Sequence, residues 1–250
     1  MSQTPERFEP PRAVLFDLDD TLFDHEHCSR AALWSVRGEH SALSGVPWEQ
    51  LRESYSRLLE EIHARLLSGE LTLQQARRER FRRLFSELGE EAPDEVVRRA
   101  AEGYAEAYRG AWLPVAGAEE LLLEVGERSK VAVVTNNLLA EQRDKLRALG
   151  LARYVDELVA SEEVGVAKPD PGIFRVALER LGCSAEETVM VGDSWESDVA
   201  GARAAGIRAV WLNRRGLECP DPEMAREAGS LAESGAFLRG MKPGSRCETL

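Results

Sequence analysis

The 250-residue chain is poor in lysine and cysteine, and it has no long apolar run. Only four of its 32 basic residues are lysines, which are Lys130, Lys145, Lys168 and Lys242. The four cysteines are scattered without a CxxC pair, which disfavours a zinc site or a disulfide framework and indicates reduced thiols. No apolar stretch approaches the ~20 residues of a membrane span, and the N-terminal residues contain no apolar signal core. The sequence therefore predicts a cytoplasmic protein that does not cross a membrane.

Positive charge is in deficit as well. The chain carries 44 acidic residues against 32 basic residues, a formal net charge of −12. This balance disfavours a nucleic acid polymer or an anionic membrane surface as the partner, because both need a basic face. A small anionic substrate stays compatible with it, since one site can be positive in an acidic protein. With 43% hydrophobic and 30% charged residues, the composition is typical of a globular protein.

Residues 25–112 carry a helical pattern without a strand signal. Apolar side chains recur at spacings of three and four over residues 51–66, and Thr72 followed by Gln75 matches a capping box. About four helices are therefore expected in this region. The other periodic stretches are 26–38 and 93–108.

After residue 114 the chain alternates between helical patterns and short apolar strands, and one further strand, residues 13–16, precedes the helical region. Such alternation predicts an α/β fold, with a parallel sheet and helices on both faces. Polar residues 1–12 are expected to form a loose leader, and the tail shows one weak helix near 223–239 and frayed last residues. The expected strands are 131–134, 157–160, 188–191 and 209–212, and the expected helices are 118–127, 138–149, 171–181 and 196–205.

The helical region interrupts the α/β pattern directly after its first strand. The expected organisation is a core domain formed by residues 1–23 and 113–250, with an all-helical domain of residues 24–112 inserted into it. An insert at this point is expected above the carboxyl end of the first strand, which is where ligands bind in open α/β sheets. The topology therefore predicts a helical lid over a ligand site.

Polar residues that can carry chemistry follow the predicted strands. Because the carboxyl ends of parallel strands lie at one edge of a sheet, we expect these residues to converge there. Each of them alone is more often a cap or a turn residue, but independent caps need not fall at the same edge. They are Asp17 and Asp19 after the first strand, Thr135, Asn136 and Asn137 after the second, Lys168 in the loop after the third, and Asp193 and Asp198 after the fourth.

This set fits the chemistry of phosphoryl transfer. Several carboxylates in a small volume repel one another and need a cation, and hard oxygen ligands suit Mg²⁺. Sites that transfer a phosphoryl group usually combine Mg²⁺ with a lysine and a hydroxyl. Thr135, where a strand turns into a helix, is suitably placed to hold phosphate oxygens. One carboxylate would serve as nucleophile, and a second, two residues on, would protonate the leaving oxygen and later activate water.

The same residues form four motifs that resemble those of the haloacid dehalogenase (HAD) superfamily of hydrolases, with a helical C1-type cap inserted after the first motif. The resemblance covers nearly all of residues 12–215 and implies a Rossmannoid core of the HAD type. Asp20 and Asn137 stand where many relatives have glycine, and both are common departures. The motifs are Val14 to Leu22 (VLFDLDDTL), Val134-Thr135-Asn136, Lys168-Pro169-Asp170-Pro171, and Val191-Gly192-Asp193-Ser194 followed by Asp198.

The resemblance also implies a role for each carboxylate. Asp17 would be the nucleophile that forms an aspartyl-phosphate, and Asp19 would be the general acid and base. Mg²⁺ would be bound by Asp17, by Asp193 and by the backbone carbonyl of Asp19. Asp198 would support the metal or the lysine from behind.

The phosphoryl group would be held by Thr135 and Asn136 and neutralised by Lys168, by the same resemblance. Asp19 favours a phosphatase over a dehalogenase, because an alkoxide leaving group needs a proton and a halide does not. A phosphonate hydrolase of this superfamily needs a lysine in the cap, and residues 1–129 contain none. A phosphosugar mutase keeps the same core residues and stays an alternative. A second alternative is a phosphometabolite-binding module without turnover, although such a module would be expected to lose its catalytic aspartates first.

The expected substrate is a small phosphate monoester, with a nucleoside monophosphate or a sugar phosphate as candidates. Residues 160–169 resemble the branch that contains bacterial pyrimidine-nucleotide 5′-nucleotidases. That branch also includes phosphoglycolate and N-acylneuraminate 9-phosphate phosphatases, so the resemblance narrows the substrate only to a class. Nothing in the sequence indicates the oligomeric state.

Side chains of the helical region are candidates for substrate specificity, each with an alternative structural interpretation. His25, His27 and Cys28 closely follow the first motif, yet they would equally belong to a solvated hinge or helix face. Aromatic residues at helical spacing would stack on a base or sugar, or pack inside the bundle. The basic segment 77–83 would receive a second anionic group, or form a solvated helix face. The aromatic residues are Trp34, Trp48, Tyr55, Tyr104 and Tyr108.

Overall fold

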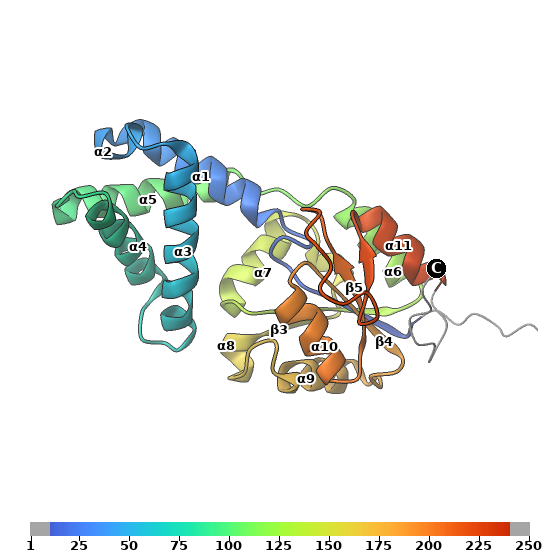
Figure 1. Ribbon diagram of the computed structural model, residues 1–250. Coiled ribbons are helices and arrows are strands. Elements are labelled where there is room, and N and C mark those ends of the chain that lie inside the picture. The colour runs from blue at the N-terminus through green and yellow to red at the C-terminus, as the bar shows by residue number, and fades with distance from the viewer. Residues whose placement is uncertain (1–10, 241–250) are drawn as a thin grey trace, which may run out of the picture. The chain divides into compact units, whose positions relative to one another are not determined.

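The structure of the protein is a computed structural model that describes residues 11–240 (Figure 1). Its internal contacts divide the chain into two compact units. The first, called here the α/β unit, runs through Asp24 and resumes at Pro114. The second, called here the helical unit, comprises His25–Leu113. The expected leader and the expected frayed end fall mostly on residues 1–10 and 241–250, which lie outside the described residues.

The α/β unit contains a six-stranded sheet in the order β3-β2-β1-β4-β5-β6, and every neighbouring pair is parallel. β1 lies between β2 and β4, and its four residues are fully buried. Burying such a Val, Leu or Phe side chain stabilises the fold by about 1.5–3 kcal/mol. The strands are β1 (Ala13–Phe16), β2 (Lys130–Thr135), β3 (Glu157–Ala160), β4 (Thr188–Gly192), β5 (Arg208–Leu212) and β6 (Arg226–Ala228).

Helices cover both faces of this sheet, so the predicted α/β fold class is confirmed (Figure 1). Side chains of alternate strand residues, such as Leu15 and Met190, pack with Ile173 and Phe174 of α9 in one apolar cluster. On the other side of the sheet, α6 contacts β2, α11 contacts β5, and the two helices contact each other. The helices are α6 (Ala118–Gly126), α7 (Leu139–Ala148), α8 (Ser161–Val164), α9 (Pro171–Leu181), α10 (Gly201–Ala204) and α11 (Leu231–Gly240), with a 3₁₀ turn at Ala152–Tyr154.

The structure corrects the sequence prediction in two places. The helix expected near 223–239 is instead the edge strand β6 followed by α11, because Arg226–Ala228 pairs with β5. Only one residue of that strand is buried, so it gives no apolar run in the sequence. The helix expected at 196–205 begins as a π-helical segment, Trp195–Ala200, and becomes α-helical only in α10.

The helical unit consists of four long helices and one short helix, and its described residues form no strand. The predicted capping box is present: Gln75 N donates to Thr72 Oγ1 at 3.2 Å, and Thr72 N donates to Gln75 Oε1 at 2.8 Å. None of the described helices in either unit is long and apolar enough to cross a membrane. The helices are α1 (His25–Glu39), α2 (Ser41–Ser44), α3 (Trp48–Leu67), α4 (Leu73–Glu87) and α5 (Asp94–Gly110).

Candidate active site

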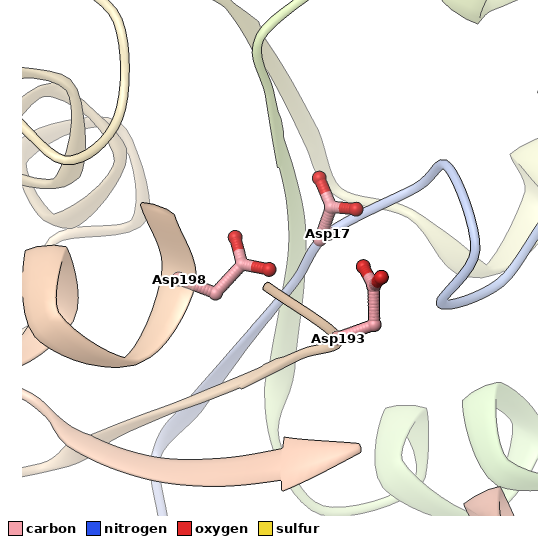
Figure 2. Close-up of side chains that lie close together, drawn as sticks. All are labelled: Asp17, Asp193 and Asp198. Atoms are coloured by element: carbon pink, nitrogen blue, oxygen red, sulfur yellow. The ribbon is translucent and has the colours of Figure 1, made fainter. Parts of the chain in front are cut away.

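Three aspartates of the α/β unit meet at the carboxyl edge of the sheet. Asp17 follows β1 and Asp193 follows β4, and these two strands are paired so that Phe16 lies level with Val191. Asp198 comes from the π-helical segment that follows β4. Carboxylate oxygens of the three residues lie within 4.8 Å of one another (Figure 2). The order of the strands in the sheet reverses between β1 and β4, and open α/β sheets bind ligands at such a reversal.

Lys168 is buried between two of these carboxylates. Its Nζ donates to Asp17 Oδ1 at 2.5 Å and to Asp198 Oδ1 at 2.6 Å. The loop that carries it is held by Asn136: Nδ2 of Asn136 donates to the Lys168 carbonyl, and Lys168 N donates to Asn136 Oδ1, both at 2.7 Å. The side-chain amide of Asn136 therefore positions the loop of the lysine by two hydrogen bonds, and a contact of Asn136 with a phosphoryl group stays a prediction.

Burial and mutual repulsion change the acidity of the carboxylates. Burial raises the pKa of Asp17 well above its ordinary value, against the lowering effect of Lys168 and with further increases from Asp198 and Asp193. Burial and the charges of Asp198 and Asp20 raise the pKa of Asp193 to about 7. Burial alone would lower the pKa of Lys168, but Asp17 and Asp198 raise it. The site thus holds more negative charge than one lysine balances, which favours binding of a cation.

Asp198 is fixed on both of its oxygens. Oδ1 accepts from Lys168, and Oδ2 accepts from Ser194 N at 3.0 Å. The close approach depends on Gly192, because a Cβ at that position would lie only 2.3 Å from Asp198 Oδ2. Asp198 therefore helps to fix the ammonium group of Lys168. The structure also places Asp198 in the carboxylate cluster with the two predicted metal ligands, Asp17 and Asp193.

The carboxylate of Asp19 has different hydrogen-bond partners from the three clustered aspartates. Its Oδ1 accepts from Lys145 Nζ at 2.5 Å, and its Oδ2 accepts from Gln142 Nε2 at 2.8 Å and from Asn137 Nδ2 at 3.2 Å. Gln142 Nε2 also donates to Thr135 Oγ1 at 2.7 Å. The structure thus links the predicted general acid and base to the predicted phosphate-binding hydroxyl, while a metal contact from the Asp19 carbonyl stays a prediction.

Sequence reasoning missed several residues that build this site. Lys145 and Gln142 lie one turn apart on the buried face of α7, and Thr21 accepts a hydrogen bond from Asp193 N at 3.1 Å. Trp211 Nε1 donates to the Asp193 carbonyl at 2.8 Å. A signal for Lys145 existed, because lysine is rare in this chain and the residue occupies an apolar position of its helix.

In the helical unit, most specificity candidates are packed inside the bundle. Tyr55, Tyr104 and Tyr108 are buried, and the Tyr104 ring centroid lies 4.9 Å from that of Tyr55. His25 Nδ1 lies 2.7 Å from Tyr108 Oη, and the buried Cys28 donates to the Ala111 carbonyl.

Other candidates of this unit lie at its surface. His27 is exposed, and Trp34 is also exposed where it makes an edge contact with Trp48. In the basic segment 77–83, Arg82 and Arg83 form exposed ion pairs, whereas Arg80 is buried.

The sheet order, the carboxylate cluster and its lysine define an α/β protein with an acidic site at the switch point of a parallel sheet. Within that class the chain belongs to the haloacid dehalogenase-like hydrolases, because the model of this family matches residues 11–206. The resemblance inferred from the four motifs is thereby confirmed.

Individual relatives cover nearly the whole chain. A phosphoserine phosphatase of Thermus thermophilus is 36% identical over 248 residues, which cover 89% of this chain and 97% of the relative. A ribulose-1,5-bisphosphate 5-phosphatase of Halopiger xanaduensis is 34% identical, with 91% and 92% covered. A pyrimidine 5′-nucleotidase of Escherichia coli is 32% identical, with 83% and 88% covered. Among solved structures, a HAD-hydrolase of Bacillus subtilis bound to magnesium matches with a TM-score of 0.74 at 25% identity, covering 92% of this chain and 99% of that one.

Proposed function

We propose that the protein is a Mg²⁺-dependent phosphatase that hydrolyses a small phosphate monoester through an aspartyl-phosphate on Asp17. The observation that carries the proposal is the position of Asp17, whose carboxylate lies among two further carboxylates and 2.5 Å from a buried lysine. The expected class of enzyme agrees with the relatives above, which are named as phosphatases.

The donor set suits Mg²⁺. Buried carboxylates with raised pKa values are stabilised by a divalent cation, and their oxygens are the hard ligands that Mg²⁺ prefers. Asp17, Asp193 and the backbone carbonyl of Asp19 would hold the ion, with Asp198 in support. When bound, the ion supplies positive charge that stabilises the transferring phosphoryl group. The related Bacillus subtilis hydrolase is described as bound to magnesium, which supports the same choice.

The chain's own residues would then divide the reaction between them. A carboxylate oxygen of Asp17 attacks phosphorus, the bond to the ester oxygen breaks, and Asp19 gives a proton to the departing alkoxide. In the second half, Asp19 takes a proton from water as the water oxygen attacks the phosphorus of the aspartyl-phosphate, which regenerates Asp17 and releases phosphate. Lys168 neutralises charge next to Asp17, and the Thr135 hydroxyl donates to a phosphoryl oxygen.

The substrate belongs to the class of small phosphorylated metabolites. By their names, the three curated relatives act on phosphate esters of an amino acid, a sugar and a nucleoside. These names therefore do not point to one common leaving group. Nucleoside monophosphates and sugar phosphates stay the first candidates, and phosphoserine joins them. We further propose that residues 24–112 form a cap domain of the core formed by 1–23 and 113–250.

A phosphate-release screen tests the proposal. Purified protein with Mg²⁺ is expected to release inorganic phosphate from p-nitrophenyl phosphate and from at least one nucleoside monophosphate, sugar phosphate or phosphoamino acid. Asp17→Asn should lower kcat by about 10³-fold or more, since the nucleophile is lost, with mass spectrometry to exclude deamidation. Excess chelator should stop turnover.

Other outcomes would favour the rival functions. Isomerised sugar phosphates without free phosphate would identify a mutase, and ligand binding without any turnover would identify a binding module. Full activity of Asp17→Asn would remove this residue as the nucleophile.

A further inference from the structure

A second buried lysine lies outside the four motifs. The Lys145 side chain is 1% exposed, its Nζ lies 2.5 Å from Asp19 Oδ1, and the same nitrogen lies 4.6 Å from the centre of the Phe23 ring. Placing an ammonium group in such surroundings is unfavourable unless a carboxylate neutralises it. Lys145 and Asp19 therefore form an ion pair in which the lysine is buried and the Asp19 side chain is 24% exposed.

Gln142, one helical turn earlier, joins the same carboxylate to the motif-two hydroxyl. Its amide nitrogen donates one hydrogen to Asp19 Oδ2 and one to Thr135 Oγ1, at 2.8 and 2.7 Å. While Asp19 is ionised it can only accept, so its contact with Gln142 then fixes which end of the amide is the nitrogen. The side chain is fully buried, and its Oε1 has no hydrogen-bond partner among the described residues. A buried oxygen without a hydrogen bond is unfavourable, yet the amide of Gln142 keeps the orientation in which its nitrogen makes both contacts.

These contacts determine what the two linked groups are able to do. Because Thr135 Oγ1 accepts from Gln142, its own hydrogen is available to donate to another oxygen. The Asp19 carboxylate is fixed on both oxygens, because Oδ1 accepts from Lys145 and Oδ2 accepts from Gln142 and Asn137. One helix thus orients both the group that would hold the phosphoryl oxygen and the group that would protonate the leaving oxygen.

We propose that Lys145 and Gln142 are positioning residues that hold Asp19 and Thr135 in the geometry needed to protonate the leaving alkoxide. The inference rests on the proposed phosphatase function, in which Asp19 is the general acid. A purely stabilising role fits poorly, since buried ion pairs add little net stability over apolar residues of similar size. The importance of the pair would therefore lie in turnover.

The leaving group distinguishes positioning from general damage. p-Nitrophenolate departs readily without a proton, whereas an alkoxide needs one. Lys145→Met, which keeps the length of the side chain, should lower kcat/KM for an alkyl phosphate by about 10- to 100-fold and for p-nitrophenyl phosphate only a few-fold. The value of kcat/KM reports the first half of the reaction, in which the ester oxygen leaves, and not the later hydrolysis, in which Asp19 takes a proton from water. Gln142→Leu should show the same selectivity, with a further increase in KM because Thr135 also loses its partner. Arg147→Met removes a cation from the exposed face of the same helix, and it should leave kcat/KM unchanged for both esters.

A double-mutant cycle with Asp19→Asn shows whether Lys145 acts through Asp19. If it does, Lys145→Met should add no further loss of kcat/KM for the alkyl ester in the Asp19→Asn background. Circular dichroism and thermal unfolding confirm that each variant is folded. Equal losses on both esters, or fully additive losses in the cycle, would overturn the positioning role while leaving the phosphatase proposal intact. A wild-type protein inert toward every ester would instead overturn the proposed function and this role together.

Discussion

The two units of this protein differ in where their paired charged side chains lie. The α/β unit buries two lysines, Lys145 and Lys168, and pairs each of them with carboxylates. The helical unit contains no lysine, and its ion pairs, such as Arg57–Glu61 and Arg98–Glu102, lie on exposed helix faces. Exposed pairs of this kind add little stability, and buried pairs are unfavourable to assemble. The carboxylate-paired buried lysines therefore support the proposal that the α/β unit performs the chemistry.

One residue of the helical unit runs against this division. Arg80 is buried, donates from Nε to the Ala76 carbonyl, and forms no ion pair among the described residues. It lies close enough to Tyr55 to lower the pKa of that phenol, although burial raises the pKa overall. Here a buried cation donates to a backbone carbonyl, whereas the α/β unit pairs its buried cations with carboxylates.

The largest effect is expected where a buried pair is broken in the α/β unit. Lys168→Met would leave Asp17 and Asp198 without their cation, which should lower the free energy of unfolding by about 3–5 kcal/mol and kcat by about 10²–10³-fold. Denaturant unfolding and steady-state kinetics measure the two losses. Lys130→Met, an exposed lysine at the start of β2, is the control and should keep kcat. Wild-type kcat in Lys168→Met would show that the buried charge has no part in turnover.

A second effect, on stability and not on kcat, is expected from the repulsion within the carboxylate cluster. The pKa of Asp193 is about 7 in the folded protein, above its ordinary value of 3.8, so the folded state binds this proton more tightly than the unfolded chain. Its contribution to stability is therefore fully present below about pH 4 and is lost as the pH rises through 7, at about 1.4 kcal/mol for each unit of pKa difference.

Asp193→Asn removes that titration. In chelator, its stability relative to wild type should increase between pH 4 and pH 7, as measured by urea unfolding at several pH values. Added Mg²⁺ should raise the stability of wild type at pH 8 and raise that of the variant less. Asp144→Asn, an exposed carboxylate on α7, should follow the wild-type curve. A constant difference between Asp193→Asn and wild type across this range would contradict the raised pKa.

The smallest effect is expected in the helical unit, from the loss of one local hydrogen bond and not of a buried charge. Thr72→Ala removes the oxygen that accepts from Gln75 N at the start of α4, and should lower the free energy of unfolding by about 1 kcal/mol. Thermal and denaturant unfolding measure the change. Ser86→Ala removes a hydroxyl from an exposed position of the same helix, away from its N-terminus, and should cause no such loss. Equal losses in both variants would show that the loss in Thr72→Ala does not come from the capping box.

The strength of sequence reasoning differed along the chain for physical reasons. The strands that carry the site were predictable because buried parallel strands are short apolar runs, and polar residues directly follow them, as Phe16 is followed by Asp17. β6 was not predictable, since a polar edge strand is defined by its pairing with β5 and not by its own residues.

The contacts between motifs were harder to predict than the motifs themselves. No spacing in the sequence indicates that the Asn136 amide holds the Lys168 backbone, or that Lys145 faces Asp19, because the partners are 32 and 126 residues apart. Aromatic residues at helical spacing were compatible with both a ligand surface and a bundle interior, and only packing decides between them. For the three tyrosines, packing favours the interior.

Gly192 places a limit on how this site can change over evolutionary time. Any other residue there would bring its first side-chain carbon into the carboxylate that holds the buried lysine. The position is therefore closed to substitution although it carries no functional group. A library of variants selected for a new substrate should return glycine at residue 192 while the helical unit diversifies, so the invariant positions of such a library would report a steric constraint as well as chemistry.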